Sequence, residues 1–308
     1  MALGAAVSDL DTSPGTEEDG RCVMAGFSVS VTVCREMAVL PEGVYLPTDD
    51  PSVYESTELA GAGWYQEGQH GGALAALIAG HVERIPTLTP MEIARLTVEI
   101  FRVVPLVPLR IETDIVREGK RIQTVETRLT GPDGTLFSMA TVQRLRTTKL
   151  SLPPEAQGPP LELTTPDRLE PFAGQTWGVG EVGRVLFHRQ AIEVREIHGG
   201  FTTKGPGAVW IRLTKPIVAG LEVTPVQRAV ATADFCNGIS RRLDVSEYVF
   251  MNSDLTVHLA RYPSGEWVAL DAESTYGPVG RGVATGSLWD LEGPLGRSTQ
   301  TLYLDRSG

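Results

Sequence analysis

Positive charge, and lysine above all, is scarce in this chain. Its 308 residues hold 27 Lys and Arg against 38 Asp and Glu, which gives a formal net charge of −11 at pH 7. Lysine occurs only at positions 120, 149, 204 and 215, so arginine carries nearly all of the positive charge. Non-specific binding to nucleic acid needs a basic surface that neutralises phosphates. The composition therefore argues against a nucleic-acid partner.

Cysteine is also rare. Cys22, Cys34 and Cys236 are the three cysteines of the chain, and no two of them form a C-x-x-C pair. Such a set predicts neither a disulfide framework nor a zinc site. A reducing compartment fits this usage, and we expect no bound metal.

Long apolar runs are missing. No stretch approaches the roughly 18 apolar residues that a membrane-spanning helix needs. The beginning of the chain lacks the basic segment and the continuous apolar core of a signal peptide. We therefore expect a cytoplasmic protein without membrane insertion, in which residues 1–36 form a weakly ordered extension.

The familiar catalytic motifs are absent as well. The sequence has no G-x-S-x-G, no H-E-x-x-H and no P-loop, and its five histidines show no metal-ligand spacing. A serine-triad or zinc hydrolase is thus disfavoured. Gly178, Gly180 and Gly183 match G-x-G-x-x-G, but no strand precedes them and residues 184–196 are expected to be extended. A dinucleotide site requires a strand before this motif and a helix after it.

The most strongly helical run is residues 69–85. Its larger apolar residues recur with helical period, and alanine and glycine fill the opposite face, so the helix is expected to have neighbours on several sides. His70, Gly71 and Gly72 begin it. Two interpretations of the glycines stay open: they leave backbone N–H groups free for an anion or a polarised carbonyl, or they only permit a tight turn and close packing.

One pattern occurs twice along the chain. The helix at 69–85 precedes four strand candidates, and a second helix, predicted at 226–243, follows a strand at 208–213 and precedes four more. The eight strand candidates that follow the helices lie at 96–104, 109–117, 121–130, 135–145, 254–260, 267–274, 281–289 and 298–304. The best match aligns Leu96-Thr97-Val98 with Leu255-Thr256-Val257, and makes Gln143 the counterpart of Gln300.

This repeat predicts an α+β fold of two tandem units, each a central helix enclosed by a curved antiparallel sheet. We place the units at 37–150 and 181–308, and a Pro-rich linker at 151–180. The two units are expected to pair their sheets and to bury their helices side by side. Exposed sheet edges favour a homo-oligomer.

Asp234 is the most unusual residue of the second helix, because its neighbours in AVATADFCNG are small and mostly apolar. Helical spacing puts it in one stripe with Asn237 and Arg241. A solvated helix face with an Asp–Arg contact is one interpretation. The other is a carboxylate in a cleft between the units, where it orients or deprotonates water.

Five short segments resemble the acyl-CoA thioesterase II (TesB-like) family over roughly residues 40–305. They are Gln69–Gly72, Ala233–Gly238, Leu255–Leu259, Glu273–Thr275 and Ser298–Gln300. The resemblance implies a double-hotdog fold, in agreement with the repeat.

The resemblance also implies that an Asp, a Thr and a Gln from the second unit hold the hydrolytic water. These residues correspond to Asp234, Thr275 and Gln300, and Ser274 is an alternative to Thr275 if the strand register shifts by one residue. The expected substrate-binding residues are His70, Gly71, Gly72, Asn237 and Ser274. Because the first helix offers no acid at the corresponding depth, we expect one active site per chain.

The predicted function is hydrolysis of an acyl-CoA, without a cofactor, to a fatty acid and CoA. A catalytically silent acyl-CoA-binding or assembly protein of the same fold is the first alternative. The second is an enoyl-CoA hydratase or dehydratase, which would call for a paired Asp and His. In the sequence, His70 has no nearby acid in its helix and Asp234 has no nearby histidine.

Overall fold

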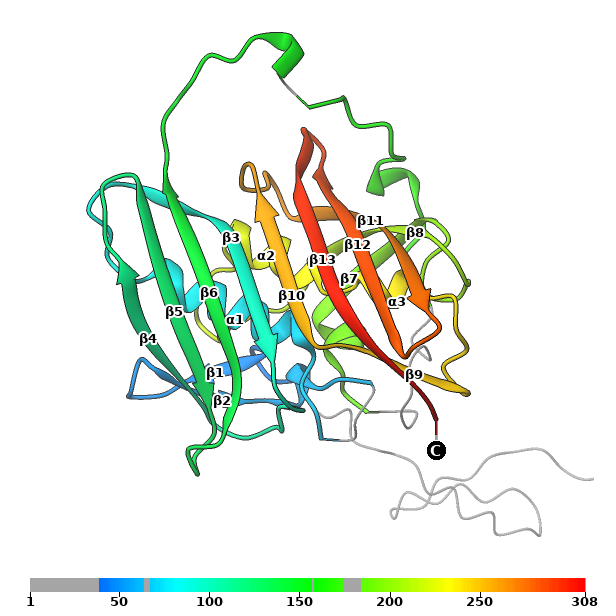
Figure 1. Ribbon diagram of the computed structural model, residues 1–308, viewed down its shortest axis with the longest axis horizontal. Helices are drawn as coiled ribbons and strands as arrows, with labels where there is room; N and C mark the ends of the chain where they lie inside the picture. The colour runs from blue at the N-terminus through cyan, green and yellow to red at the C-terminus, as the bar shows by residue number, and fades with distance from the viewer. Residues whose placement is uncertain (1–38, 64–66, 157, 174–183, 308) are drawn as a thin grey trace, which may run out of the picture. The chain divides into compact units, whose positions relative to one another are not determined.

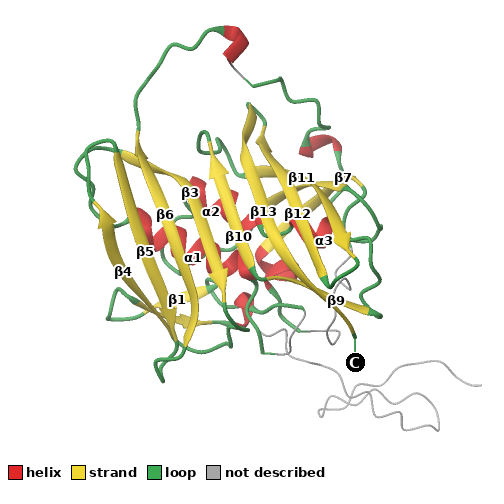
Figure 2. Ribbon diagram, in the orientation of Figure 1, coloured by secondary structure: helices red, strands yellow, loops and turns green. Residues whose placement is uncertain are grey.

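A thirteen-stranded antiparallel sheet supports the described part of the chain (Figures 1 and 2). The computed structural model describes residues 39–63, 67–156, 158–173 and 184–307. The predicted extension at 1–36 and the motif Gly178, Gly180, Gly183 lie outside these residues. Residues Pro41–Gly308 form one compact unit.

The strands of the first half are β1 Tyr45–Pro47, β2 Val53–Ser56, β3 Met91–Ile100, β4 Leu109–Arg117, β5 Ile122–Thr130 and β6 Leu136–Arg146. Those of the second half are β7 Ile192–His198, β8 Gly207–Leu213, β9 Tyr248–Asn252, β10 Asp254–Leu259, β11 Trp267–Gly277, β12 Arg281–Asp290 and β13 Gly293–Arg306. The helices are α1 Gly71–Glu83, α2 Pro225–Ala233 and α3 Cys236–Ile239, with short helical turns at Glu58–Ala60, Pro154–Ala156, Pro166–Arg168 and Phe187–Ala191.

The two halves meet at β3 and β10. The strand order is β1-β2-β4-β5-β6-β3-β10-β13-β12-β11-β8-β7, and β9 also pairs with β13. In the β3–β10 pair Leu96 lies opposite Val257 and Val98 opposite Leu255, while the Thr256 hydroxyl donates to the Thr97 hydroxyl at 3.2 Å. Each tripeptide of the sequence repeat thus pairs with its own counterpart, around a local two-fold axis at the threonines. The predicted pairing of the two sheets is confirmed.

Helices α1 and α2 lie side by side against one face of the sheet (Figure 1). A close contact between α1 and α2 depends on Gly80, because a Cβ atom there would lie 2.2 Å from Gln227 Nε2. That amide instead donates to the Ala76 carbonyl at 3.1 Å. The small residues of α1 therefore pack against the second helix, as the sequence predicted.

The second helix differs from its predicted range of 226–243. It ends at Ala233, Asp234 is its C-cap, and α3 starts again at Cys236. The Gln300 amide donates to the Asp234 carbonyl at 2.9 Å, a bond that satisfies a helix-terminal oxygen. Asp234 consequently lies at a helix end, and Arg241 donates to the Thr203 carbonyl at 3.4 Å instead of contacting it.

The sheet register also corrects one repeat assignment. Thr97 lies opposite Thr141, and its counterpart Thr256 lies opposite Thr299. The residue equivalent to Gln300 is therefore Val142, not Gln143. A shift by one residue in a strand moves a side chain to the other face, and both Val142 and Gln300 face the buried side.

Candidate active site

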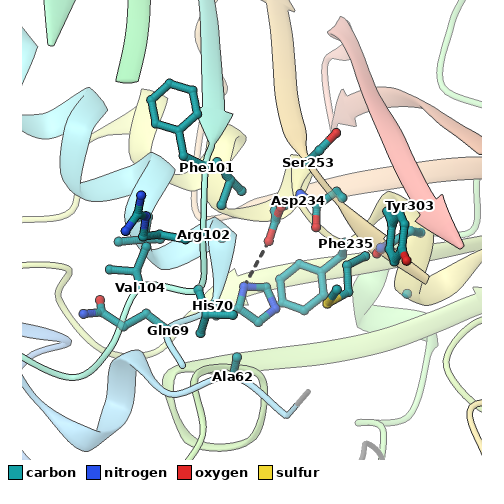
Figure 3. A pocket seen from close by; sticks show the side chains of 18 residues that line it. Ala62, Gln69, His70, Phe101, Arg102, Val104, Asp234, Phe235, Ser253 and Tyr303 are labelled. Carbon is teal, nitrogen blue, oxygen red and sulfur yellow. Dashed lines mark hydrogen bonds and ion pairs between the residues drawn. The ribbon is translucent and has the colours of Figure 1, made fainter. Parts of the chain in front are cut away.

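Asp234 lies where the end of α2 meets the start of α1 (Figure 3). The residue is 6% exposed. A Cβ atom on Gly71 would be 2.8 Å from Asp234 Oδ1 and 2.9 Å from Oδ2, so the absence of a side chain at Gly71 makes room for the carboxylate.

Two amides hold the Asp234 carboxylate. Asn252 Nδ2 donates to Oδ1 at 3.0 Å, and Gln300 Nε2 donates to the same oxygen at 3.1 Å. Gln300 Oε1 accepts the Asn237 backbone N–H at 3.2 Å, which fixes the orientation of the Gln300 amide. Because both hydrogens of Gln300 Nε2 go to Asp234 atoms, Gln300 orients the carboxylate.

His70 contacts the other carboxylate oxygen. Its Nδ1 lies 3.1 Å from Asp234 Oδ2 and 3.0 Å from the Gly72 nitrogen. One imidazole nitrogen either carries a hydrogen or offers a lone pair, so Asp234 and the Gly72 N–H compete for His70 Nδ1. The ring lies next to Phe187 and Phe235, with centroid distances of 5.1 and 4.7 Å. The sequence places no acid near His70 and no histidine near Asp234, but the fold brings these two residues into contact.

The start of α1 also offers a free donor. Among the described residues, the backbone N–H of Gly71 has no hydrogen-bond acceptor, whereas the Gly72 N–H donates to His70 and the next two donate to the His70 carbonyl. A free N–H beside a buried carboxylate can polarise a carbonyl group of a ligand.

Asp234, Asn252, His70 and Gly71 line a cavity of about 380 Å³, which we call the Asp234 cavity, whereas Gln300 and Gly72 are not among its lining residues. Its walls are largely apolar, and Arg102 is the single Lys or Arg among the lining residues. Figure 3 shows Phe101 and Tyr303 on opposite sides of the His70–Asp234 pair. Both aromatic residues are about half exposed. The lining residues are Ala62, Gln69, His70, Gly71, Leu74, Ile100, Phe101, Arg102, Val103, Val104, Asp234, Phe235, Asn237, Gly238, Met251, Asn252, Ser253 and Tyr303.

Two of the expected site residues lie elsewhere. Thr275 is exposed and points away from the buried side of β11, and it does not line the Asp234 cavity. Ser274 is buried, but its hydroxyl bonds to the Ser240 hydroxyl at 2.7 Å and it also lies outside the cavity. The structure brings Asp234, Gln300, Asn237, His70, Gly71 and Gly72 together. Thr275 lies apart because alternate residues of a strand face opposite sides, and Ser274 lies apart because it faces Ser240 at the end of α3.

Asn252 is the site residue that sequence reasoning missed. It is the last residue of β9, a strand that no pattern in the sequence indicated, and it reaches Asp234 only because β9 pairs with β13. An asparagine carries no local signal of such a long-range contact.

The described residues contain no group of three or more His, Cys, Asp and Glu side chains that could hold a metal ion. Within the same part of the chain, no helix has the length and apolar character needed to cross a membrane.

Two family models match the sequence. The model of the acyl-CoA thioesterase N-terminal domain matches residues 61–145, and that of the acyl-CoA thioesterase C-terminal domain matches residues 163–304. No curated protein sequence matches the chain.

Solved structures show the same fold. A hot dog fold protein of unknown function from Alicyclobacillus acidocaldarius is 18% identical, with a TM-score of 0.65 over 85% of this chain and 96% of that chain. The acyl-CoA thioesterase II TesB2 from Mycobacterium marinum is 13% identical, with a TM-score of 0.59 over 83% and 93%. The tesB protein of Mycobacterium avium subs paratuberculosis is 15% identical, with a TM-score of 0.57 over 77% and 88%. The predicted α+β double-hotdog fold is confirmed.

Proposed function

Because the chain belongs to the acyl-CoA thioesterase family and is a thioester hydrolase, we propose that it hydrolyses an acyl-CoA to a fatty acid and CoA with a water molecule activated by Asp234. The observation that carries this proposal is the buried Asp234 carboxylate, which two amides hold beside the unpaired Gly71 N–H in an apolar cavity.

In the proposed step, Asp234 removes a proton from water as the water oxygen attacks the thioester carbonyl carbon. The Gly71 N–H donates to the carbonyl oxygen, which gains negative charge. The C–S bond then breaks, and the proton held by Asp234 passes to the thiolate or to solvent. A thiol ionises near pH 8.5, so its thiolate leaves without a strong acid.

The proposal changes the roles expected from the family resemblance. Gln300 and Asn252 act as positioning residues for Asp234, since their amide nitrogens donate to its carboxylate. His70 donates from Nδ1 to Oδ2 when Nδ1 carries the hydrogen, and so fixes the second oxygen. Thr275, which lies on the exposed side of β11, has no part in this mechanism.

The test is release of free CoA from a panel of acyl-CoAs by the wild type and by Asp234→Asn. The asparagine keeps the shape but cannot accept the proton of water, so kcat should fall by about 10²–10⁴-fold. Asp114→Asn is the matched control, because Asp114 is exposed and far from the cavity in the strand order. Equal CoA release by the wild type and Asp234→Asn would overturn the assignment of Asp234.

One observation favours the hydratase alternative, which calls for a paired Asp and His: His70 Nδ1 lies 3.1 Å from Asp234 Oδ2. Crotonyl-CoA separates the two activities. A hydratase removes the enoyl absorbance without thiol release, whereas the proposed hydrolase releases thiol. Tight acyl-CoA binding without turnover at any chain length would favour the silent binding protein instead.

A further inference from the structure

The local two-fold axis at Thr97 and Thr256 relates the wall segments of the Asp234 cavity to equivalent segments elsewhere in the fold. Two wall segments of that cavity are Ile100–Val103 of the first half and Met251–Ser253 of the second. In the register of the β3–β10 pair, their counterparts are Leu259–Tyr262 and Glu92–Ala94.

These counterpart segments line a second cavity of about 510 Å³, at the opposite ends of β3 and β10. Leu145, the counterpart of Tyr303 in the corrected register, lines it too. Residues 146–149 complete the wall. The fold therefore contains two cavities related by its internal symmetry.

The helix ends follow the same symmetry. Asp234 at the end of α2 faces the start of α1, and Glu83 at the end of α1 accepts a hydrogen bond of 2.5 Å from the Thr224 hydroxyl, the N-cap of α2. Counted from the N-caps His70 and Thr224, the residue of α1 equivalent to Asp234 is Gly80, and Glu83 lies three residues further along the helix. Burial raises the pKa of the Glu83 carboxyl.

The groups that make the Asp234 cavity hydrolytic are missing from its counterpart. Pro225 takes the place of Gly71 as the first residue of the helix, and a proline has no N–H to offer a carbonyl. Val142 takes the place of Gln300, and Ile93 that of Asn252. The second cavity therefore lacks the free donor and both amides that hold the carboxylate.

In their place the second cavity has cations. Arg146, Lys149 and Arg261 line it, against one acidic lining residue, Glu92. Arg261 is held in a bidentate pair with the buried Asp290. Within the described part of the chain, neither Arg146 nor Lys149 has an acidic partner at salt-bridge distance.

Two cations without acidic partners suit a phosphate group, which they bind through charge-assisted hydrogen bonds. They stand out in a chain of net charge −11. Thr148, which lies between them on the same wall, adds a hydroxyl donor, whereas the Thr147 hydroxyl donates to the Pro90 carbonyl at 3.3 Å. The Asp234 cavity has a single such cation, Arg102.

We propose that the second cavity is a non-hydrolytic site that binds the phosphate-bearing nucleotide of CoA through Arg146 and Lys149. The ligand is the free CoA that the proposed function releases, but binding there requires no turnover. A failure of the thioesterase assay would therefore leave this test intact.

The test is calorimetric titration of the full-length protein with free CoA, in the wild type and in Arg146→Ala/Lys149→Ala. We expect two binding events in the wild type, and at least about tenfold weaker affinity for one of them in the double variant. Arg110→Ala/Lys204→Ala is the matched control, since it removes the same charges from residues that line neither cavity.

Two probes identify the ligand group. Adenosine 3′,5′-diphosphate should compete with CoA for the site lost in the double variant, and pantetheine, which has no phosphate, should not. Identical CoA binding by the wild type and the double variant would overturn the proposal. Competition by pantetheine equal to that by the nucleotide would also overturn it. Thermal unfolding of each variant checks that the exposed substitutions leave the fold intact.

Discussion

At the scale of single residues, the candidate site depends on Gly71. Both oxygens of Asp234 would lie within 3 Å of a Cβ at this position. Those contacts are closer than any alanine permits, so a side chain here has to displace the carboxylate.

We predict that Gly71→Ala lowers kcat for acyl-CoA hydrolysis by about 10²-fold, because a shift of about 1 Å in a catalytic group has an effect of that size. The free energy of unfolding should change little, because the higher helix propensity of alanine, worth up to about 1 kcal/mol, opposes the cost of the clash with Asp234. Steady-state kinetics and thermal unfolding separate the two effects.

Gly277→Ala is the control for this substitution. The nearest atom to a Cβ at Gly277 is the Arg281 carbonyl oxygen at 3.4 Å, an ordinary contact. Its kinetics should match those of the wild type. A Gly71→Ala enzyme with unchanged kcat would contradict the placement of Asp234 against the start of α1.

Sequence reasoning reached part of this site. Asp234 stood out as an acid among small residues, and Gln300 came from the family resemblance. The His70–Asp234 contact could not be predicted, because 164 positions separate the two residues and only the packing of α1 against α2 joins them. Thr275 was expected at the site from the family resemblance, but it lies on the exposed face of β11, because a strand turns adjacent residues to opposite faces.

At the scale of elements, the end of α1 contains a histidine that must stay neutral. Arg84 donates to the Tyr54 hydroxyl, which is hydrogen-bonded to His81 Nδ1 at 2.9 Å. Protonation of His81 would bring a second cation close to Arg84. Burial, and then the Arg84 charge, lowers the pKa of His81 from 6.5 to about 4.

This lowered pKa predicts a loss of stability in mild acid. Between pH 6.5 and about 4 the unfolded chain binds a proton at His81 that the folded chain does not, so the free energy of unfolding falls as the pH falls. We expect a decrease on the order of 1–2 kcal/mol, allowing for solvent screening of a partly exposed ring.

The measurement is urea unfolding from pH 7 to 4, in the wild type and in His81→Gln. Glutamine does not titrate, so the difference in unfolding free energy between the two proteins should shrink as the pH falls. A constant difference across this range would rule out His81 as the source.

Element boundaries follow from the sequence where one local signal dominates. The strand predicted at 109–117 matches β4, because its apolar residues alternate and turn residues follow it. The helix predicted at 226–243 is broken, because the Gln300 side chain from β13 bonds to the Asp234 carbonyl at the end of α2. A contact from a distant strand leaves no mark in a helical pattern.

At the scale of the whole molecule, one repeat has produced two unequal halves. The β3–β10 pair joins them, and so do hydrogen bonds from the Val44 and Tyr45 nitrogens to the carbonyls of Pro216 and Ile217, which follow β8 in the chain. The general arrangement was predictable from the duplicated strand motif. The chemical difference between the two halves was not predictable, because it depends on single positions, such as Gln300 in the second half and Val142 in the first. Only the strand register shows that these two positions are equivalent. A homo-oligomer stays a prediction.

The central claim is that Asp234 activates a water molecule that attacks the thioester directly. A single turnover in water labelled with oxygen-18, with enzyme in excess over acyl-CoA, tests it by mass spectrometry of the fatty acid. Direct attack predicts a labelled oxygen in the acid from the first turnover. An unlabelled acid in that turnover, with label appearing later, would mean that the acyl group passes through a carboxylate of the protein, and would contradict the account.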